Sequence, residues 1–188
     1  NCGRTAPLTI MGPPGLSSVV SSLLVIAPEL PFSLQLCEMI PNTTHTWGNS
    51  LEISTLALSH GIPCLGYRVT IKRKPVFNPK KAQALGIPLR CYHVLHEGGS
   101  IIQDGHTVTP EMVTDGARAP IQICYCTDSH PLDTIAAFAA NADLFICEGM
   151  YGDDAFHLKM QEKGHMVFSD SARLAKAANV KRLWITHY

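Results

Sequence analysis

The 188-residue sequence has no excess of charge, because fifteen lysines and arginines balance fifteen aspartates and glutamates. Proteins that bind RNA usually carry positive charge, since contacts with phosphates supply much of their affinity. The overall balance therefore argues against a nucleic-acid partner unless the basic residues are concentrated locally. The sequence also has no apolar run of the roughly 20 residues that cross a membrane; Leu16–Leu36 is interrupted by Pro28 and Pro31. We expect no membrane-embedded segment, and the first residues lack the pattern of a secretory signal.

The seven cysteines contain no C-x-x-C pair and are odd in number. Cys124 and Cys126 alternate within an apolar run, so both should point to one face of a strand. The favoured interpretation is a set of buried free thiols in a reducing cytoplasm. A hydrophobic content of 46% and a charged content of 16% are typical of a folded globular chain. Length and composition together predict one domain over residues 1–188.

Strand and helix patterns alternate along the chain without internal repeats, which predicts an α/β architecture. Helices are expected over Ser17–Ile26, Asn78–Leu85, Pro131–Ala142, and from Ser169 or Asp170 to about Asn179. Strands are expected over Pro7–Met11, Phe32–Glu38, Leu51–Ser59, Gly66–Lys72, Ile121–Cys126, Asp143–Cys147 and Lys181–Thr186.

Local signals fix several ends of these elements. Gly12-Pro13-Pro14-Gly15 has the character of a strand-to-helix turn, because the Gly-Lys-Ser/Thr ending of a phosphate loop is absent. Asn78 is a favourable N-cap, and Ser129 is a possible cap of the helix that follows it. Asp104-Gly105 predicts the turn of a hairpin over Gly98–Val108.

Four predicted strands end in a residue suited to metal binding or acid–base chemistry: His60, Asp128, Glu148 and His187. Any one of them alone is more often a structural or solvated residue, and Asp128 alone is more often a turn residue. Strands of α/β proteins place ligand sites at their ends, where rigid elements hold the side chains. Two histidines and two carboxylates brought together there would form a metal site.

Two further features have both a functional and a structural interpretation. In the functional interpretation, His165 of Lys163-Gly164-His165 reaches across the strand ends and acts as a general acid near neutral pH. In the structural interpretation, it is a histidine of a surface loop. The marked basic cluster is either a solvated face or a contact surface for phosphates; its members are Lys72, Arg73, Lys74, Lys80 and Lys81.

Ordered blocks across nearly the whole chain resemble the ribonuclease Z family, the endonucleases that trim the 3′ ends of tRNA precursors. These blocks are PLTIMGPPG, LSHGIPCLGYRV, NPKKAQALGIP, CTDS, DLFICEGMY and KGHMVFSDSARLAKAANVKRLWITHY. The resemblance implies the αββα sandwich of the metallo-β-lactamase fold, with two mixed sheets face to face and helices outside. NPKKAQALGIP resembles the start of a protruding substrate-binding arm, expected over residues 73–99.

The resemblance also implies roles for individual residues. His60 and His187 would each bind one of two Zn²⁺ ions, and Asp128 would bridge both. His165 would donate a proton to the leaving oxygen, and Glu148 would orient it. The basic cluster would contact a tRNA precursor, and the expected assembly is a homodimer in which one subunit's arm serves the other's cleft.

Departures from the family pattern leave other functions open. The family's His-x-His-x-Asp-His signature is expected before PLTIMGPPG and is not in the sequence. We therefore expect the chain to be a fragment that lacks the first strands of one half. His-Ser-Thr of the family is replaced by His165-Met166-Val167. A hydrolase of small phosphodiesters with the same fold, and a metal-free binding relative, remain alternative functions.

Overall fold

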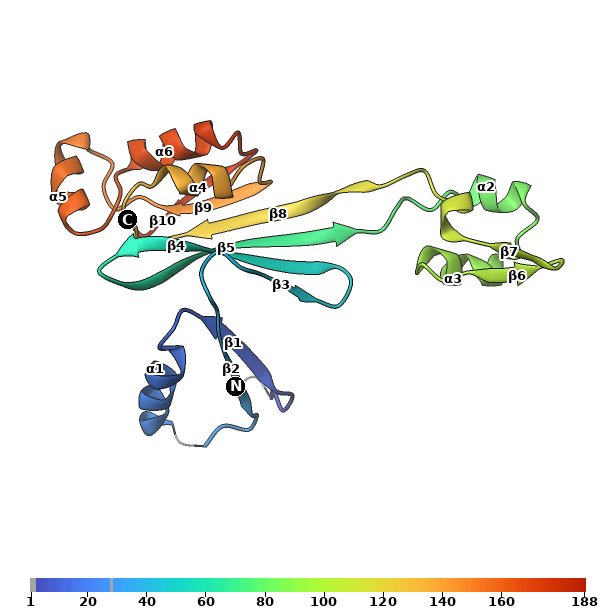
Figure 1. Cartoon of the computed structure of the whole chain (residues 1–188), viewed down its shortest axis with the longest axis horizontal. Helices are drawn as coiled ribbons and strands as arrows, with labels where there is room; N and C mark the ends of the chain where they lie inside the picture. The colour runs from blue at the N-terminus through green and yellow to red at the C-terminus, as the bar shows by residue number, and fades with distance from the viewer. Residues whose placement is uncertain (1–2, 28) are drawn as a thin grey trace. The chain divides into compact units, whose positions relative to one another are not determined.

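The computed structural model describes residues 3–27 and 29–188, which divide into two compact units (Figure 1). Unit 1 comprises residues 1–47, 52–70 and 122–188, and unit 2 comprises residues 48–51 and 71–121. Each unit has a hydrophobic core of its own.

Unit 1 contains most of a six-stranded sheet, whose strand order is β10-β9-β8-β5-β4-β3. The strands of this sheet are β3 (Thr44–Trp47), β4 (Leu51–His60), β5 (Ile62–Arg73), β8 (Arg118–Cys126), β9 (Leu144–Glu148) and β10 (Leu183–Thr186). The strands β8, β9 and β10 are parallel neighbours, and Tyr125, Ile146 and Trp184 share one row across them. In Figure 1 the arrowheads of β4 and β8 point to the same edge of the sheet. The sequence predicted these strands except β3.

Helices connect the parallel strands and cover one face of the sheet. Helix α4 (Asp133–Phe138) lies between β8 and β9, and α6 (Phe168–Ala177) lies between β9 and β10. Parallel strands need such crossovers, which bring the carboxyl ends of all three strands to one edge. A short helix, α5 (His157–Glu162), preceded by the 3₁₀ turn η4 (Asp154–Phe156), lies in the second crossover.

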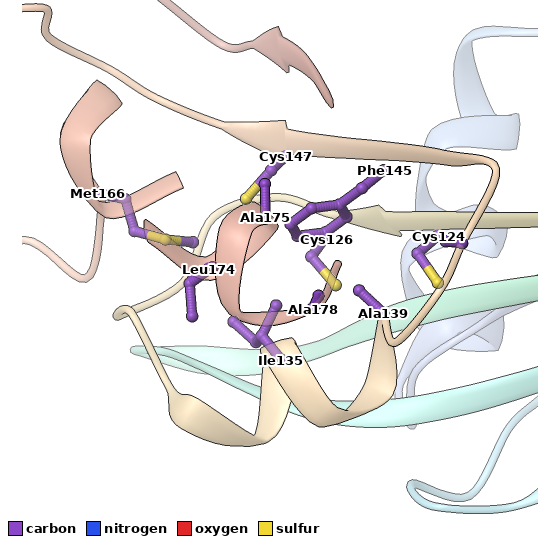
Figure 2. Packing of buried hydrophobic residues seen from close by; sticks show 11 residues of the cluster. Cys124, Cys126, Ile135, Ala139, Phe145, Cys147, Met166, Leu174, Ala175 and Ala178 are labelled. Atoms are coloured by element: carbon purple, nitrogen blue, oxygen red, sulfur yellow. The ribbon is translucent and has the colours of Figure 1, made fainter. Parts of the chain in front are cut away.

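The core of unit 1 lies between this sheet and helices α4 and α6, as Figure 2 shows. Cys124, Cys126, Phe145 and Cys147 contribute the sheet side and are all fully buried. Gly66 of β5 allows close packing here, because a Cβ atom at that position would lie 2.8 Å from the Cys126 sulfur. The prediction that Cys124 and Cys126 share a buried strand face is confirmed, and six described cysteines are free thiols.

The start of unit 1 is a smaller strand–helix–strand segment. The strands β1 (Leu8–Gly12) and β2 (Leu34–Glu38) are parallel, and α1 (Leu16–Leu23) with the 3₁₀ turn η1 (Leu24–Ile26) connects them. The Gly-Pro-Pro-Gly sequence is a strand-to-helix turn, as predicted. The Glu38 carboxylate accepts a hydrogen bond from the backbone N–H of Ser17 at 3.0 Å. Backbone hydrogen bonds from Ser17 and Gly15 hold the pKa of Glu38 below its usual value.

Unit 2 contains short helices and one hairpin, together with the end of β5 and the start of β8. Its helices are α2 (Pro79–Ala84) and α3 (Tyr92–His96), with 3₁₀ turns η2 (Leu89–Cys91) and η3 (Pro110–Val113). The antiparallel strands β6 (Ile101–Gln103) and β7 (His106–Val108) turn at Asp104 and Gly105, both at positive φ. This hairpin was predicted. So was the Asn78 cap, whose side chain accepts from the backbone N–H groups of Lys80 and Lys81.

Two predicted helix caps were wrong. Helix α4 begins after Leu132 without a side-chain cap, because the Ser129 hydroxyl is used elsewhere and donates to the carbonyl of His130 at 2.8 Å. Helix α6 begins after Val167, earlier than predicted. Asp170 lies inside the first turn, where its carboxylate accepts the Val167 N–H at 3.4 Å.

The buried thiols predict a loss of stability at alkaline pH. Burial raises the pKa of Cys124 to about 11 and that of Cys147 to about 12, from an ordinary value of 9.0. The folded state therefore retains protons that the unfolded chain releases above pH 9, and stability is lost as pH rises from 9 toward 11, by about 1.4 kcal/mol per pH unit for each thiol. Urea unfolding at pH 8 and pH 10.5 should show a smaller pH dependence for Cys124→Ala than for the wild type. Cys147→Ala should also show a smaller pH dependence. A pH dependence equal to that of the wild type in both variants would contradict the raised thiol pKa values.

Among residues 3–27 and 29–188, none of the helices combines the length and the apolar character that a membrane crossing requires.

Candidate metal centre

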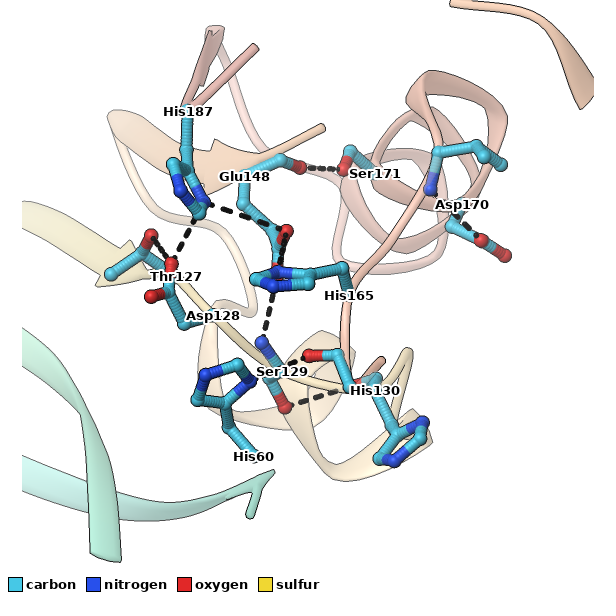
Figure 3. A network of polar contacts seen from close by, with 12 residues as sticks. His60, Thr127, Asp128, Ser129, His130, Glu148, His165, Asp170, Ser171 and His187 are labelled. Carbon is cyan, nitrogen blue, oxygen red and sulfur yellow. Dashed lines mark hydrogen bonds and ion pairs between the residues drawn. The ribbon is translucent and has the colours of Figure 1, made fainter. Parts of the chain in front are cut away.

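The carboxyl ends of the parallel strands bring polar residues together at one edge of the sheet in unit 1 (Figure 3). Glu148 is the last residue of β9, Asp128 lies two residues beyond β8, and His187 directly follows β10. His60 ends β4 in the same sheet. Residues separated by more than a hundred positions in the sequence therefore share one site.

Asp128 and His187 form the exposed side of this site. The Nδ1 atom of His187 lies 2.8 Å from the Asp128 carboxylate, and both side chains are roughly 40% exposed. Both residues have positive φ, 48° and 60°. Such backbone is uncommon for residues other than glycine and is concentrated at functional sites. The other described non-glycine residues at positive φ are all Asn or Asp, which tolerate it, so His187 is the exception.

Glu148 and His165 form the buried side. The Glu148 side chain is fully buried, accepts the Ser129 backbone N–H at 2.5 Å, and lies 3.0 Å from Nδ1 of His165. A buried carboxylate needs such partners because water no longer solvates it. Since the carboxylate accepts, Nδ1 of His165 donates, and its Nε2 is left for another partner. The Ser171 hydroxyl also donates to the Glu148 carbonyl, which ties the end of β9 to helix α6.

His60 is held by the loop that carries His165. Its Nδ1 lies 3.0 Å from the carbonyl of Gly164, so Nδ1 carries the proton and Nε2 is available as a metal ligand. Gly164 has a φ of 77°, and a Cβ atom there would lie 2.9 Å from this ring nitrogen. Glycine is therefore required at this position. The ring centroids of His60 and His165 are 4.8 Å apart, and those of His165 and His187 are 5.3 Å apart.

The donor atoms present fit a metal ion. One atom each from Asp128, His165 and His187 lies within 4.8 Å of the other two. Two ligands of one Zn²⁺ ion, each bound at roughly 2.0–2.2 Å, lie no more than about 4.4 Å apart. Small side-chain movements would bring the Asp128 and His187 atoms into range of one ion beside His165, and a carboxylate oxygen with an imidazole nitrogen suits a borderline cation.

The structure thus brings together the five residues at which sequence patterns predicted a site: His60, Asp128, Glu148, His165 and His187. The predicted basic cluster lies in unit 2. There Lys74 pairs with Glu97 at 2.5 Å, Lys81 pairs with Asp115 at 3.0 Å, and Arg73 donates to the Ala119 carbonyl at 2.7 Å. Much of the charge of this cluster therefore has local partners.

Sequence reasoning missed the supporting residues. The backbone N–H of Ser129 and the carbonyl of Gly164 hold Glu148 and His60 through contacts that no local pattern indicates. Thr127 was also missed; its hydroxyl donates to the Asp128 carboxylate at 2.8 Å.

Comparisons of sequence and of structure show which known proteins this chain resembles. No protein-family model matches the chain. A ribonuclease Z of Lachnospira eligens is 44% identical over 188 residues, which is all of this chain and 62% of that protein. The chain therefore spans less than two thirds of the length of this curated relative.

Solved structures show the same fold. Human tRNase Z, short form, matches 96% of this chain and 60% of its own with a TM-score of 0.62 and 21% identity. Zn²⁺-bound PqqB from Methylobacterium extorquens matches 96% of this chain and 54% of its own with a TM-score of 0.53 and 14% identity. Together with the metallo-β-lactamase fold protein YhfI from Bacillus subtilis, at a TM-score of 0.56, these likenesses confirm the predicted metallo-β-lactamase fold.

Proposed function

Because this chain is a relative of the ribonuclease Z proteins along its whole length and has the metallo-β-lactamase fold, we propose that it acts as a metal-dependent endoribonuclease that removes 3′ trailers from tRNA precursors. The observation that carries the proposal is the cluster of Asp128, His165 and His187 at the carboxyl edge of the sheet. The sequence relationship supports the proposed substrate class, and the cluster supports the proposed chemistry.

We assign metal binding to Asp128 and His187, with His60 as the ligand from β4. The Gly164 carbonyl fixes the His60 tautomer so that Nε2 can bind. Asp128 is held by Thr127 and His187. A bound Zn²⁺ supplies Lewis-acid stabilisation of phosphoryl charge and activation of water. In the complete site we expect two Zn²⁺ ions.

We assign proton donation to His165. Its Nδ1–H is anchored on the buried Glu148 carboxylate at 3.0 Å, which directs Nε2 toward Asp128 and His187. The same contact holds the imidazole ring in the orientation that a proton donor needs. Glu148 is therefore a positioning residue, and His165 protonates the leaving ribose oxygen.

The proposal extends to location and assembly. Free thiols throughout the described part of the chain agree with a reducing cytoplasm. The family resemblance supports a homodimer and supports residues 73–99 as an arm in which Lys72, Arg73, Lys74, Lys80 and Lys81 contact the tRNA backbone. Light scattering of the full-length protein would measure the assembly.

The test of the activity is cleavage of a precursor tRNA with a 3′ trailer by full-length protein. We expect the trailer to be released with Zn²⁺ present, the reaction to stop on chelation, and His60→Ala to lose at least 10-fold in rate, the lower range for altered metal sites. His157→Ala is the matched control, since His157 pairs with Asp170 outside the cluster. Cleavage unchanged by chelator and by His60→Ala would contradict the proposal. A small chromogenic phosphodiester cleaved fast beside intact precursor tRNA would select the small-substrate hydrolase instead.

A further inference from the structure

Unit 2 contains an aromatic hollow that the proposed chemistry does not use. It has a volume of about 340 Å³ and is lined by Phe77, Pro79, Tyr92, His93 and His96. The rings of Phe77 and Tyr92 lie 5.1 Å apart at 50°, and Phe77 meets His96 at 80° and 6.1 Å. Aromatic and imidazole rings therefore make up most of the lining of the hollow.

A second, polar hollow of about 460 Å³ lies in the same unit. It is lined by Asn49, Ser50, Lys72, Arg73, Lys74 and Glu97. Glu97 connects the two hollows, because its carboxylate contacts Lys74 at 2.5 Å on one side and Nδ1 of His96 at 3.8 Å on the other. The bound ammonium of Lys74 holds the pKa of Glu97 below its usual value, so this ion pair is charged at neutral pH.

The charge of the chain is divided unequally between the two units. Unit 2 has seven lysines and arginines against four acidic residues, a net charge of +3. Unit 1 has eight against eleven, a net charge of −3, which accounts for the neutral total. Unit 2 thus has the local excess of positive charge that an RNA contact requires.

We propose that the two hollows of unit 2 hold one unpaired nucleotide of an RNA, with its base against Phe77, Tyr92 and His96 and its phosphate on the Lys72 to Lys74 side. This inference rests on the proposed function and adds a base-recognition site to it. An aromatic hollow takes a base through its flat faces, and an adjacent cationic surface takes the phosphate. Bases within a duplex have their faces covered by their neighbours, so the site selects unpaired nucleotides.

Two RNA probes test the proposed nucleotide site. The first is a series of hairpins, each with a single 2-aminopurine at a different loop position. The second is a blunt RNA duplex with the same number of phosphates. We expect full-length protein to quench the fluorescence at one loop position and to bind the hairpin roughly 10-fold more tightly than the duplex, as stacking of one base implies. His96→Ala, an exposed change, should reduce the quenching and this preference.

Three further variants separate stacking from charge. Tyr92→Leu should abolish the quenching and the preference for the hairpin while leaving the salt dependence of binding unchanged. Lys74→Ala should weaken binding of both RNAs and reduce the salt slope by about 1. Leu89→Ala, a matched exposed position of unit 2 outside the hollows, should change neither property.

Equal affinity of wild-type protein for hairpin and duplex, with no quenching at any loop position, would overturn the inference and leave only backbone contact. Because Tyr92 packs against the core of unit 2, the quenching by wild-type protein decides the question even if Tyr92→Leu fails to fold. Quenching without any cleavage of precursor tRNA would instead remove the proposed function and retain the nucleotide site.

Discussion

Asp128→Asn should reduce precursor cleavage by about 10²-fold or more and lower the metal content of the purified protein, because losing a ligand costs at least as much as losing a residue that supports one. The substitution removes the only negative charge among the three clustered donors while nearly conserving shape. Asparagine tolerates the φ of 48° at this position and can still accept the hydrogen bond from Thr127. We therefore expect a melting temperature close to that of the wild type, so that the loss of activity reports metal binding.

The control for Asp128→Asn is Asp104→Asn. Asp104 has a φ of 50° in the hairpin of unit 2, so the same chemical change is made in a similar backbone conformation. This variant should keep wild-type metal content and activity. Metal content of Asp128→Asn equal to that of the control would exclude Asp128 as a ligand.

His165→Ala should lower the rate of cleavage by about 10²- to 10⁴-fold, the range that a general acid contributes, with metal content maintained. The same change leaves the fully buried Glu148 carboxylate without its imidazole partner. Removing one hydrogen-bond partner of a buried polar group costs roughly 1–3 kcal/mol. The Ser129 N–H still binds Glu148 and limits the loss. Urea unfolding should therefore show reduced stability as well.

His165→Gln separates the two effects. Its amide can donate to Glu148, so stability should recover, whereas activity should not because an amide cannot donate a proton to the leaving oxygen. Loss of metal from His165→Ala would show instead that His165 is a ligand, and recovery of activity in His165→Gln would contradict proton donation.

The strand ends are what made this site predictable. A buried strand cannot carry an ionisable group in its middle without partners, so a polar residue at its end is informative even in a single sequence. Asp128, Glu148 and His187 follow apolar strands that pair in parallel, and parallel pairing brings such ends together. His60 was predicted for the same reason, from a strand that the sheet places in the same layer.

What sequence reasoning missed depends on contacts over long distances. The carbonyl of Gly164 fixes the tautomer of His60 across 104 residues, and nothing near either residue indicates it. Ser129 was predicted as a helix cap because local patterns count only neighbours, while its backbone N–H binds Glu148 and its hydroxyl oxygen accepts the Ser59 N–H. The neutral total charge concealed the difference between the two units, since the sum over the chain cancels it.

The most direct test of the account is an anomalous difference map from crystals of the full-length protein grown with Zn²⁺ and measured at the zinc edge. We expect a peak about 2.0–2.2 Å from a carboxylate oxygen of Asp128 and from a ring nitrogen of His187. The absence of any peak within coordination distance of both residues in zinc-loaded crystals would contradict it.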